Sequence, residues 1–164
     1  MHYEKKLKSI LNEELPSLTS QKRKQYRPSI DEIISIYIIL NNALFNNKLS
    51  LPKIELLKSP KRYFGECAAL ELFPKYKKKS NCVIRLAENW CCKQFFINIL
   101  AHEMVHQYQW DIESKVRLCA NLKPIISHGP SFFKHKRKFK KYNLSLKRTY
   151  SIENWYKYQN LLKI

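Results

Sequence analysis

Glycine is scarce in this chain: 164 residues contain two, Gly65 and Gly129. We expect such rare glycines to stand where a side chain would not fit. The five cysteines form no CxxC pair, which argues against a cysteine-based zinc ribbon and favours buried free thiols in a reducing compartment. No apolar run approaches the roughly 20 residues of a membrane-spanning helix, and the N-terminus does not resemble a signal peptide. We therefore expect an intracellular protein with no membrane partner.

Acidic residues are also few. There are 13 Asp and Glu against 31 Lys and Arg, a formal net charge of +18. Such an excess implies an anionic partner, with nucleic acid the first expectation and an anionic membrane surface the second. The chain is nevertheless 45% hydrophobic and 13% aromatic, a composition that excludes a disordered chain. Its length of 164 residues fits about one domain.

The apolar spacing predicts a mixture of helices and short strands. Ser29 and Glu32 form a capping-box pattern that opens a buried helix running to about Phe45. The other expected helices are 3–13, 90–109 and 129–142, with 110–127 mostly irregular. The expected strands are 54–57, 62–70 and 81–86, joined by antiparallel, hairpin-like connections. The last strand either pairs with an extended peptide or is simply an edge strand.

The segment with the clearest chemistry is an H-E-x-x-H motif within the 90–109 helix. His102 and His106 lie four residues apart, so a helix places both imidazoles on one face. Glu103 lies about 100° around the axis and can reach a metal-bound water without being a ligand. A zinc hydrolase needs this arrangement, because zinc acidifies the water and the carboxylate takes its proton.

A third metal ligand is expected downstream of the motif, since catalytic zinc usually has three protein ligands and a water. The metzincin pattern is excluded, because Gln109 and Ile112 stand where it requires Gly and His. We favour His128, which precedes Gly129 and Pro130 at an expected helix start. The other candidates are His135, Glu113 and Glu153. His135 lies among cations and is expected to be a solvated histidine on a basic face.

These residues resemble the SprT-like metalloprotease family, which includes bacterial SprT and eukaryotic Spartan. The resemblance is carried by His102-Glu103-Met104-Val105-His106 and by Ser127-His128-Gly129-Pro130-Ser131-Phe132, with softer matches at 44–49, 63–65 and 82–86. It implies a compact α+β domain of the zincin type, with a small antiparallel or mixed three-stranded sheet packed on helices and the H-E-x-x-H helix buried. It also implies Zn²⁺ held by His102, His106 and His128, with Glu103 as the base.

The activity implied by the resemblance is DNA-gated cleavage of proteins bound or crosslinked to DNA. The chain then divides into a basic, partly helical extension (1–28), the metalloprotease domain (29–142) and a C-terminal tail (143–164) that packs as a strand, a helix or both. The family's C-terminal zinc ribbon has no counterpart in the sequence, so we expect the basic surface to engage DNA, single-stranded or junction DNA above all. That places the protein with DNA, in the cytoplasm and nucleoid or in the nucleus.

One segment concentrates the positive charge. The expected helix 129–142 carries six cations that can neutralise phosphates close to the active site, while its phenylalanines face the core. The predicted nucleic-acid-binding residues are Lys134, Lys136, Arg137, Lys138, Lys140 and Lys141.

Tyr108 and Gln109 either line the cleft or serve the fold, and Trp90 and Trp110 are expected to pack rather than to contact substrate. The alternative function is a zinc-containing nucleic-acid-binding module without protease activity, in which a fourth protein ligand closes the metal site.

Overall fold

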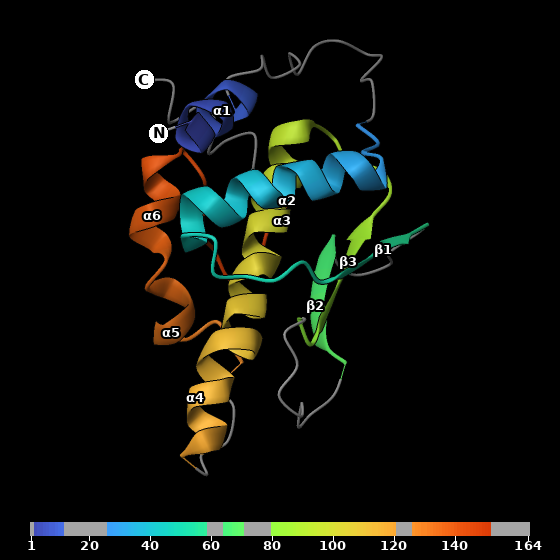
Figure 1. Cartoon of the computed structure of the whole chain (residues 1–164). Coiled ribbons are helices and arrows are strands. Elements are labelled where there is room, and N and C mark those ends of the chain that lie inside the picture. The colour runs from blue at the N-terminus through green and yellow to red at the C-terminus, as the bar shows by residue number, and fades with distance from the viewer. Residues whose placement is uncertain (1, 12–25, 59–63, 71–79, 121–125, 152–164) are drawn as a thin grey trace.

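The protein is described from a computed structural model that covers residues 2–11, 26–58, 64–70, 80–120 and 126–151 (Figure 1). It has the expected α+β architecture, a small mixed sheet beside several helices. The helices are α1 (His2–Leu11), α2 (Ile30–Phe45), α3 (Lys93–Tyr108), the π-helix η1 (Gln109–Glu113), α4 (Ser114–Cys119), α5 (Pro130–Phe133) and α6 (Lys136–Lys141). The strands are β1 (Lys53–Leu57), β2 (Gly65–Ala69) and β3 (Cys82–Ala87). In the described parts, no helix has the length and apolarity needed to cross a bilayer.

The sheet has the order β1-β3-β2. The strands β2 and β3 pair antiparallel, as expected, but β1 pairs with β3 in parallel, so the prediction of antiparallel connections throughout was wrong. The cause is topological: β3 inserts between β1 and β2, and the chain must cross over after β1. The strand β3 is therefore central and largely buried, which corrects the expectation that it is an edge strand open to a peptide.

Helix α2 begins where the sequence predicts. The Ser29 hydroxyl accepts a hydrogen bond from the Glu32 amide at 3.1 Å, which satisfies one of the free N–H groups of the first turn. The helix ends at Asn46, whose φ of 55° is left-handed. It packs across the core, although Ile38 remains exposed.

Helix α3 is the centre of the core; α2 crosses it and the sheet lies beside it (Figure 1). Its apolar side chains from Phe95 to Val105 are almost entirely buried. The chain stays helical through η1 and α4 to Cys119, where the sequence predicted irregular structure from residue 110. The Ser114 hydroxyl stabilises the junction by donating to the Gln109 carbonyl at 2.8 Å.

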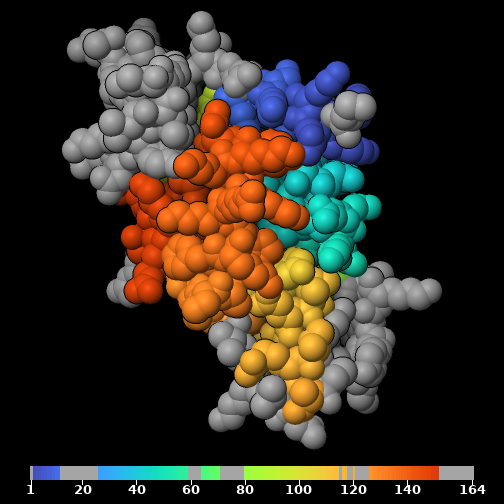
Figure 2. Space-filling view, turned by 90° about the vertical axis from the view of Figure 1, so that its left-hand side faces the viewer, coloured from blue at the N-terminus to red at the C-terminus, as the bar shows by residue number. Residues whose placement is uncertain are grey.

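The expected single helix over 129–142 is two short helices, α5 and α6, separated at 134–135. Phe132 and Phe139 are fully buried, as predicted, and they fasten both helices to the core. In Figure 2, α5 and α6 form one face, bordered by α1 and the end of α2. Residues 143–151 contain no helix or strand, yet Leu144 and Leu146 are buried against the core. The remainder of the predicted tail lies outside the described residues.

Candidate metal centre

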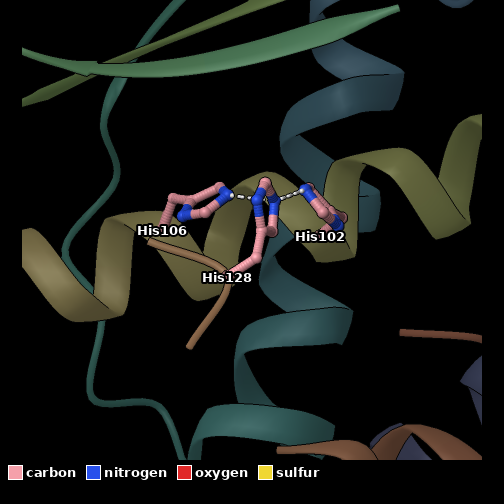
Figure 3. A group of neighbouring side chains, drawn as sticks. All are labelled: His102, His106 and His128. Carbon is pink, nitrogen blue, oxygen red and sulfur yellow. Dashed lines mark hydrogen bonds between the residues drawn. The ribbon is translucent and has the colours of Figure 1, made fainter. Parts of the chain in front are cut away.

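Three histidines converge at one point. His102 and His106 lie one turn apart on α3, and His128 reaches them from the segment that precedes α5 (Figure 3). The Nε2 atom of His128 is 3.1 Å from Nε2 of His106 and 3.1 Å from Nε2 of His102. The ligand-capable nitrogens of the three rings all lie within 4.8 Å of one another. Of the downstream candidates that the structure describes, His128 is therefore the one that joins the motif.

The donor set fits a tetrahedral metal. Zinc–nitrogen bonds of about 2.0–2.1 Å place neighbouring donors roughly 3.3 Å apart, close to the spacing seen here. Burial lowers the pKa of His102 to about 2, helped by the charges of His106 and His128. Burial also lowers the pKa values of His106 and His128. The rings are thus neutral, and a neutral imidazole is the form that binds a metal.

Gln109 holds two parts of this centre together. Its Oε1 lies 2.9 Å from Nδ1 of His106, so that ring nitrogen donates and Nε2 keeps its lone pair for a metal. Its Nε2 donates to the Ser127 carbonyl at 2.9 Å and to the Ser131 hydroxyl at 2.8 Å, on either side of His128. Gln109 is fully buried and is the first residue of the π-helix η1.

Glu103 lies on the neighbouring face of α3 and is 5% exposed. Burial, and next the charge of Glu66, raise the pKa of Glu103 to about 8, while a hydrogen bond from the Cys67 backbone lowers it. A carboxylate with such a raised pKa holds a proton more strongly than usual near neutral pH, as a general base requires. Gly65 on β2 packs directly against its side chain.

A cavity of about 450 Å³ opens over these groups. The three histidines and Glu103 all lie on its wall, so a metal held there would face open space on one side. The start of β2 forms another wall. The remaining lining residues are Phe64, Gly65, Glu66, Cys67, Ile99, Ile126, Arg148, Thr149 and Tyr150. Phe132 supports the site from beneath, its ring centroid 4.7 to 4.8 Å from those of all three histidines.

The six predicted cations of the 134–141 segment are all exposed, and none lines the cavity. Lys134 pairs with Glu113, and Lys141 pairs with Glu4 at 2.8 Å. Lys138 donates to the Leu44 carbonyl at 3.0 Å. Within the described residues, the side chains of the other three make no ion pair or hydrogen bond: Lys136, Arg137 and Lys140.

The other candidate ligands that the structure describes, His135 and Glu113, do not join the centre. His135 was expected to be solvated but is 8% exposed, because the break between α5 and α6 turns it inward between the rings of Phe45 and Tyr108. Glu113 serves the ion pair with Lys134, and Glu153 lies outside the described residues. Trp90 is buried in the core, as predicted.

Sequence reasoning missed the ligand-orienting role of Gln109 and the cavity wall at 148–150. The signal for Gln109 was present, since a residue three positions after His106 lies on the same helix face. Nothing local marks Arg148 or Tyr150, which reach the site only through the path of the chain after α6.

The sequence model of the SprT-like family matches residues 33–151 of this chain. The matched span includes all three histidines and Glu103. A search of curated protein sequences gives no match.

Proposed function

The chain belongs to the SprT-like family, generally a family of metalloproteases, and on that premise we propose that it is a zinc-dependent endopeptidase acting on proteins bound or crosslinked to DNA. The observation that carries the proposal is the convergence of three neutral imidazoles beside Glu103 on the wall of a cavity. His102, His106 and His128 are the ligands that would hold the metal.

Zinc bound there would acidify a water molecule and polarise the scissile carbonyl. Glu103 accepts a proton from the water molecule while the water oxygen attacks the carbonyl carbon. The same carboxyl group then donates that proton to the amine nitrogen as the C–N bond breaks, which leaves a free carboxylate and a free amine. Burial of Glu103 raises its pKa, which favours uptake of the proton from the water.

The cavity supports a peptide substrate rather than a closed structural metal. Within the described residues, β2 pairs with β3 on one side only, and its first residues line the cavity. An extended peptide can pair with the free edge of such a strand and bring a carbonyl to the metal.

The DNA partner is supported by charge. The chain carries a net charge of +18, and Lys136, Arg137 and Lys140 are exposed without ion partners in the described part of the structure. Contacts between such cations and phosphates give binding that is independent of sequence and weakened by salt. Because these cations lie outside the cavity, we propose that DNA occupies a separate surface and holds the protein substrate nearby.

The test is cleavage of a basic DNA-binding protein, histone H1, by the zinc-loaded protein with and without single-stranded DNA. The proposal predicts fragments that require DNA and disappear with a chelator. Fragments that form equally without DNA would contradict the role of DNA and would indicate a peptidase that acts independently of it. Intact histone, with zinc and DNA both bound, would contradict the peptidase and favour the nucleic-acid-binding module.

A further inference from the structure

The chain after α6 is fastened to α3 next to the metal centre. Asn98 is fully buried, one turn before His102. Its Oδ1 accepts from the Ser145 amide at 2.8 Å, and its Nδ2 donates to the Ser145 carbonyl at 3.0 Å. Such a two-way pairing fixes the backbone of the segment against the helix that carries the motif.

Tyr150 closes this segment into a loop. Its hydroxyl donates to the Ser145 carbonyl at 2.7 Å and accepts from the Lys147 amide at 2.9 Å. The Tyr150 ring also packs edge-on against His102, with ring centroids 5.3 Å apart. Residues 145–150 are therefore held at both ends, and Arg148 lies at the turn between the two fixed points.

Arg148 borders the cavity together with the three histidines and Glu103. Its side chain is exposed and makes no ion pair with the described residues. The guanidinium is thus available to a molecule in the cavity.

The other polar groups on the cavity wall do not offer a comparable donor. Glu66 and Glu103 are carboxyl groups, and the Tyr150 hydroxyl already donates to the Ser145 carbonyl. The Cys67 thiol has a raised pKa, owing to its hydrogen bond with Cys82 and to burial. Thr149 adds a neutral hydroxyl. Among the described lining residues, Arg148 is the single cation.

We propose that Arg148 stabilises the negative charge that develops on the scissile carbonyl oxygen during hydrolysis. This inference rests on the proposed peptidase function. A donor beside the developing charge acts in the transition state rather than on the bound substrate, and removing one such donor typically costs about 100- to 1,000-fold in kcat. Arg148 is therefore expected to determine kcat and to affect KM little.

The experiment compares Arg148→Met and Arg148→Lys with the full-length zinc-loaded protein. Lys147→Met is the matched control, because it removes a neighbouring cation that does not line the cavity. The substrate is a quenched fluorescent peptide that spans a mapped histone H1 cleavage site, assayed with single-stranded DNA present. A phosphinic peptide of the same sequence, which mimics the transition state, gives a second readout by its Ki. Zinc content and thermal unfolding verify that each variant is loaded and folded.

The proposal predicts that Arg148→Met lowers kcat about 100-fold or more and leaves KM within about threefold. The Ki of the phosphinic peptide should rise by about the same factor as kcat falls. Arg148→Lys should recover part of the loss, and Lys147→Met should match the parent. A defect confined to KM would overturn the proposal in favour of substrate recognition, and an unchanged kcat would overturn it outright. A zinc content in Arg148→Met well below that of the parent would also overturn it, in favour of a structural role. An inactive parent would instead refute the underlying peptidase function.

Discussion

Gly65 on β2 and Glu103 on α3 are packed so closely that no side chain fits between them. A Cβ atom at position 65 would lie 3.0 Å from Cγ of Glu103, 3.1 Å from its Oε1 and 2.9 Å from Cγ2 of Ile99. The backbone of Gly65 does not have a positive φ, so packing alone demands glycine. The expectation that the rare glycines stand where a side chain is excluded is confirmed at this position, and it ties the sheet directly to the proposed base.

Gly65→Ala should therefore displace the Glu103 carboxylate. We expect a loss of stability of roughly 1–3 kcal/mol from overpacking, and a loss of cleavage of at least tenfold with zinc affinity retained. Urea denaturation, zinc titration and the histone assay measure the three quantities. Gly129→Ala is the matched control, because a Cβ there would meet only the Ser127 hydroxyl, at 3.2 Å. Equal stability and activity losses in the two variants would contradict the packing argument.

Gln109→Leu should weaken zinc binding. The substitution removes the acceptor for Nδ1 of His106 and the two donations that hold the segment around His128. Loss of such a partner typically lowers metal affinity about 10- to 100-fold. Competition with a chromophoric chelator at pH 7 measures this directly. Gln109→Glu keeps the acceptor but loses the amide donor, so its affinity should fall between those of the parent and the leucine variant. Unchanged zinc affinity in Gln109→Leu would contradict the assigned role.

Two triple variants of equal charge distinguish the free cations from the paired ones. Replacing Lys136, Arg137 and Lys140 with alanine should weaken DNA binding and reduce the slope of log K against log salt by up to about 2.7 for duplex DNA. Replacing Lys134, Lys138 and Lys141 should have a smaller effect, because these side chains already contact Glu113, Leu44 and Glu4. Fluorescence anisotropy at several salt concentrations provides both values. Identical slopes in the two variants would contradict the prediction that the unpaired cations contribute more to DNA binding than the paired ones.

His135 should make the fold sensitive to acid. Burial, and next the charges of Lys134 and Lys138, lower its pKa from an ordinary 6.5 to about 4. Between these values the unfolded state binds more protons than the folded state, so stability falls as the pH drops from about 6.5 to 4. The loss attributable to His135 is on the order of 2 kcal/mol.

His135→Phe removes this titration while keeping a ring between Phe45 and Tyr108. In chelator-treated protein, we expect its free energy of unfolding to decline less between pH 7 and pH 4 than that of the parent. The metal-site histidines titrate in both proteins, so the difference between the two curves isolates position 135. Parallel curves would contradict a buried, neutral His135.

The parts of the fold that sequence predicted well are those set by local chemistry. Ser29 caps α2 because its hydroxyl reaches the Glu32 amide, and the i, i+4 spacing of His102 and His106 is a property of any helix. The place of His128 beside the motif was predicted from its position just before an expected helix start and from the ability of imidazole to bind a metal. The predicted division into 1–28, 29–142 and 143–164 and the catalytic roles of the site residues stay predictions.

The parts that sequence missed depend on contacts distant along the chain. The parallel pairing of β1 with β3 is decided by where β3 inserts, which no local pattern reveals. The helix break at 134–135 buries His135 against Phe45, some 90 residues earlier, and so overrides the charged neighbours that suggested exposure. Arg148 borders the cavity in a segment whose backbone Asn98 holds at Ser145, a contact between residues 47 positions apart.

The central claim is that three histidines hold a zinc ion whose water is activated by Glu103. Its most direct test measures zinc content and histone cleavage in the same samples of the parent and of Glu103→Gln, with single-stranded DNA present. The account predicts one zinc per chain in both proteins and fragments from the parent alone. Equal cleavage by Glu103→Gln would contradict the assignment of the base, and a parent that carries zinc but yields no fragments would contradict the peptidase.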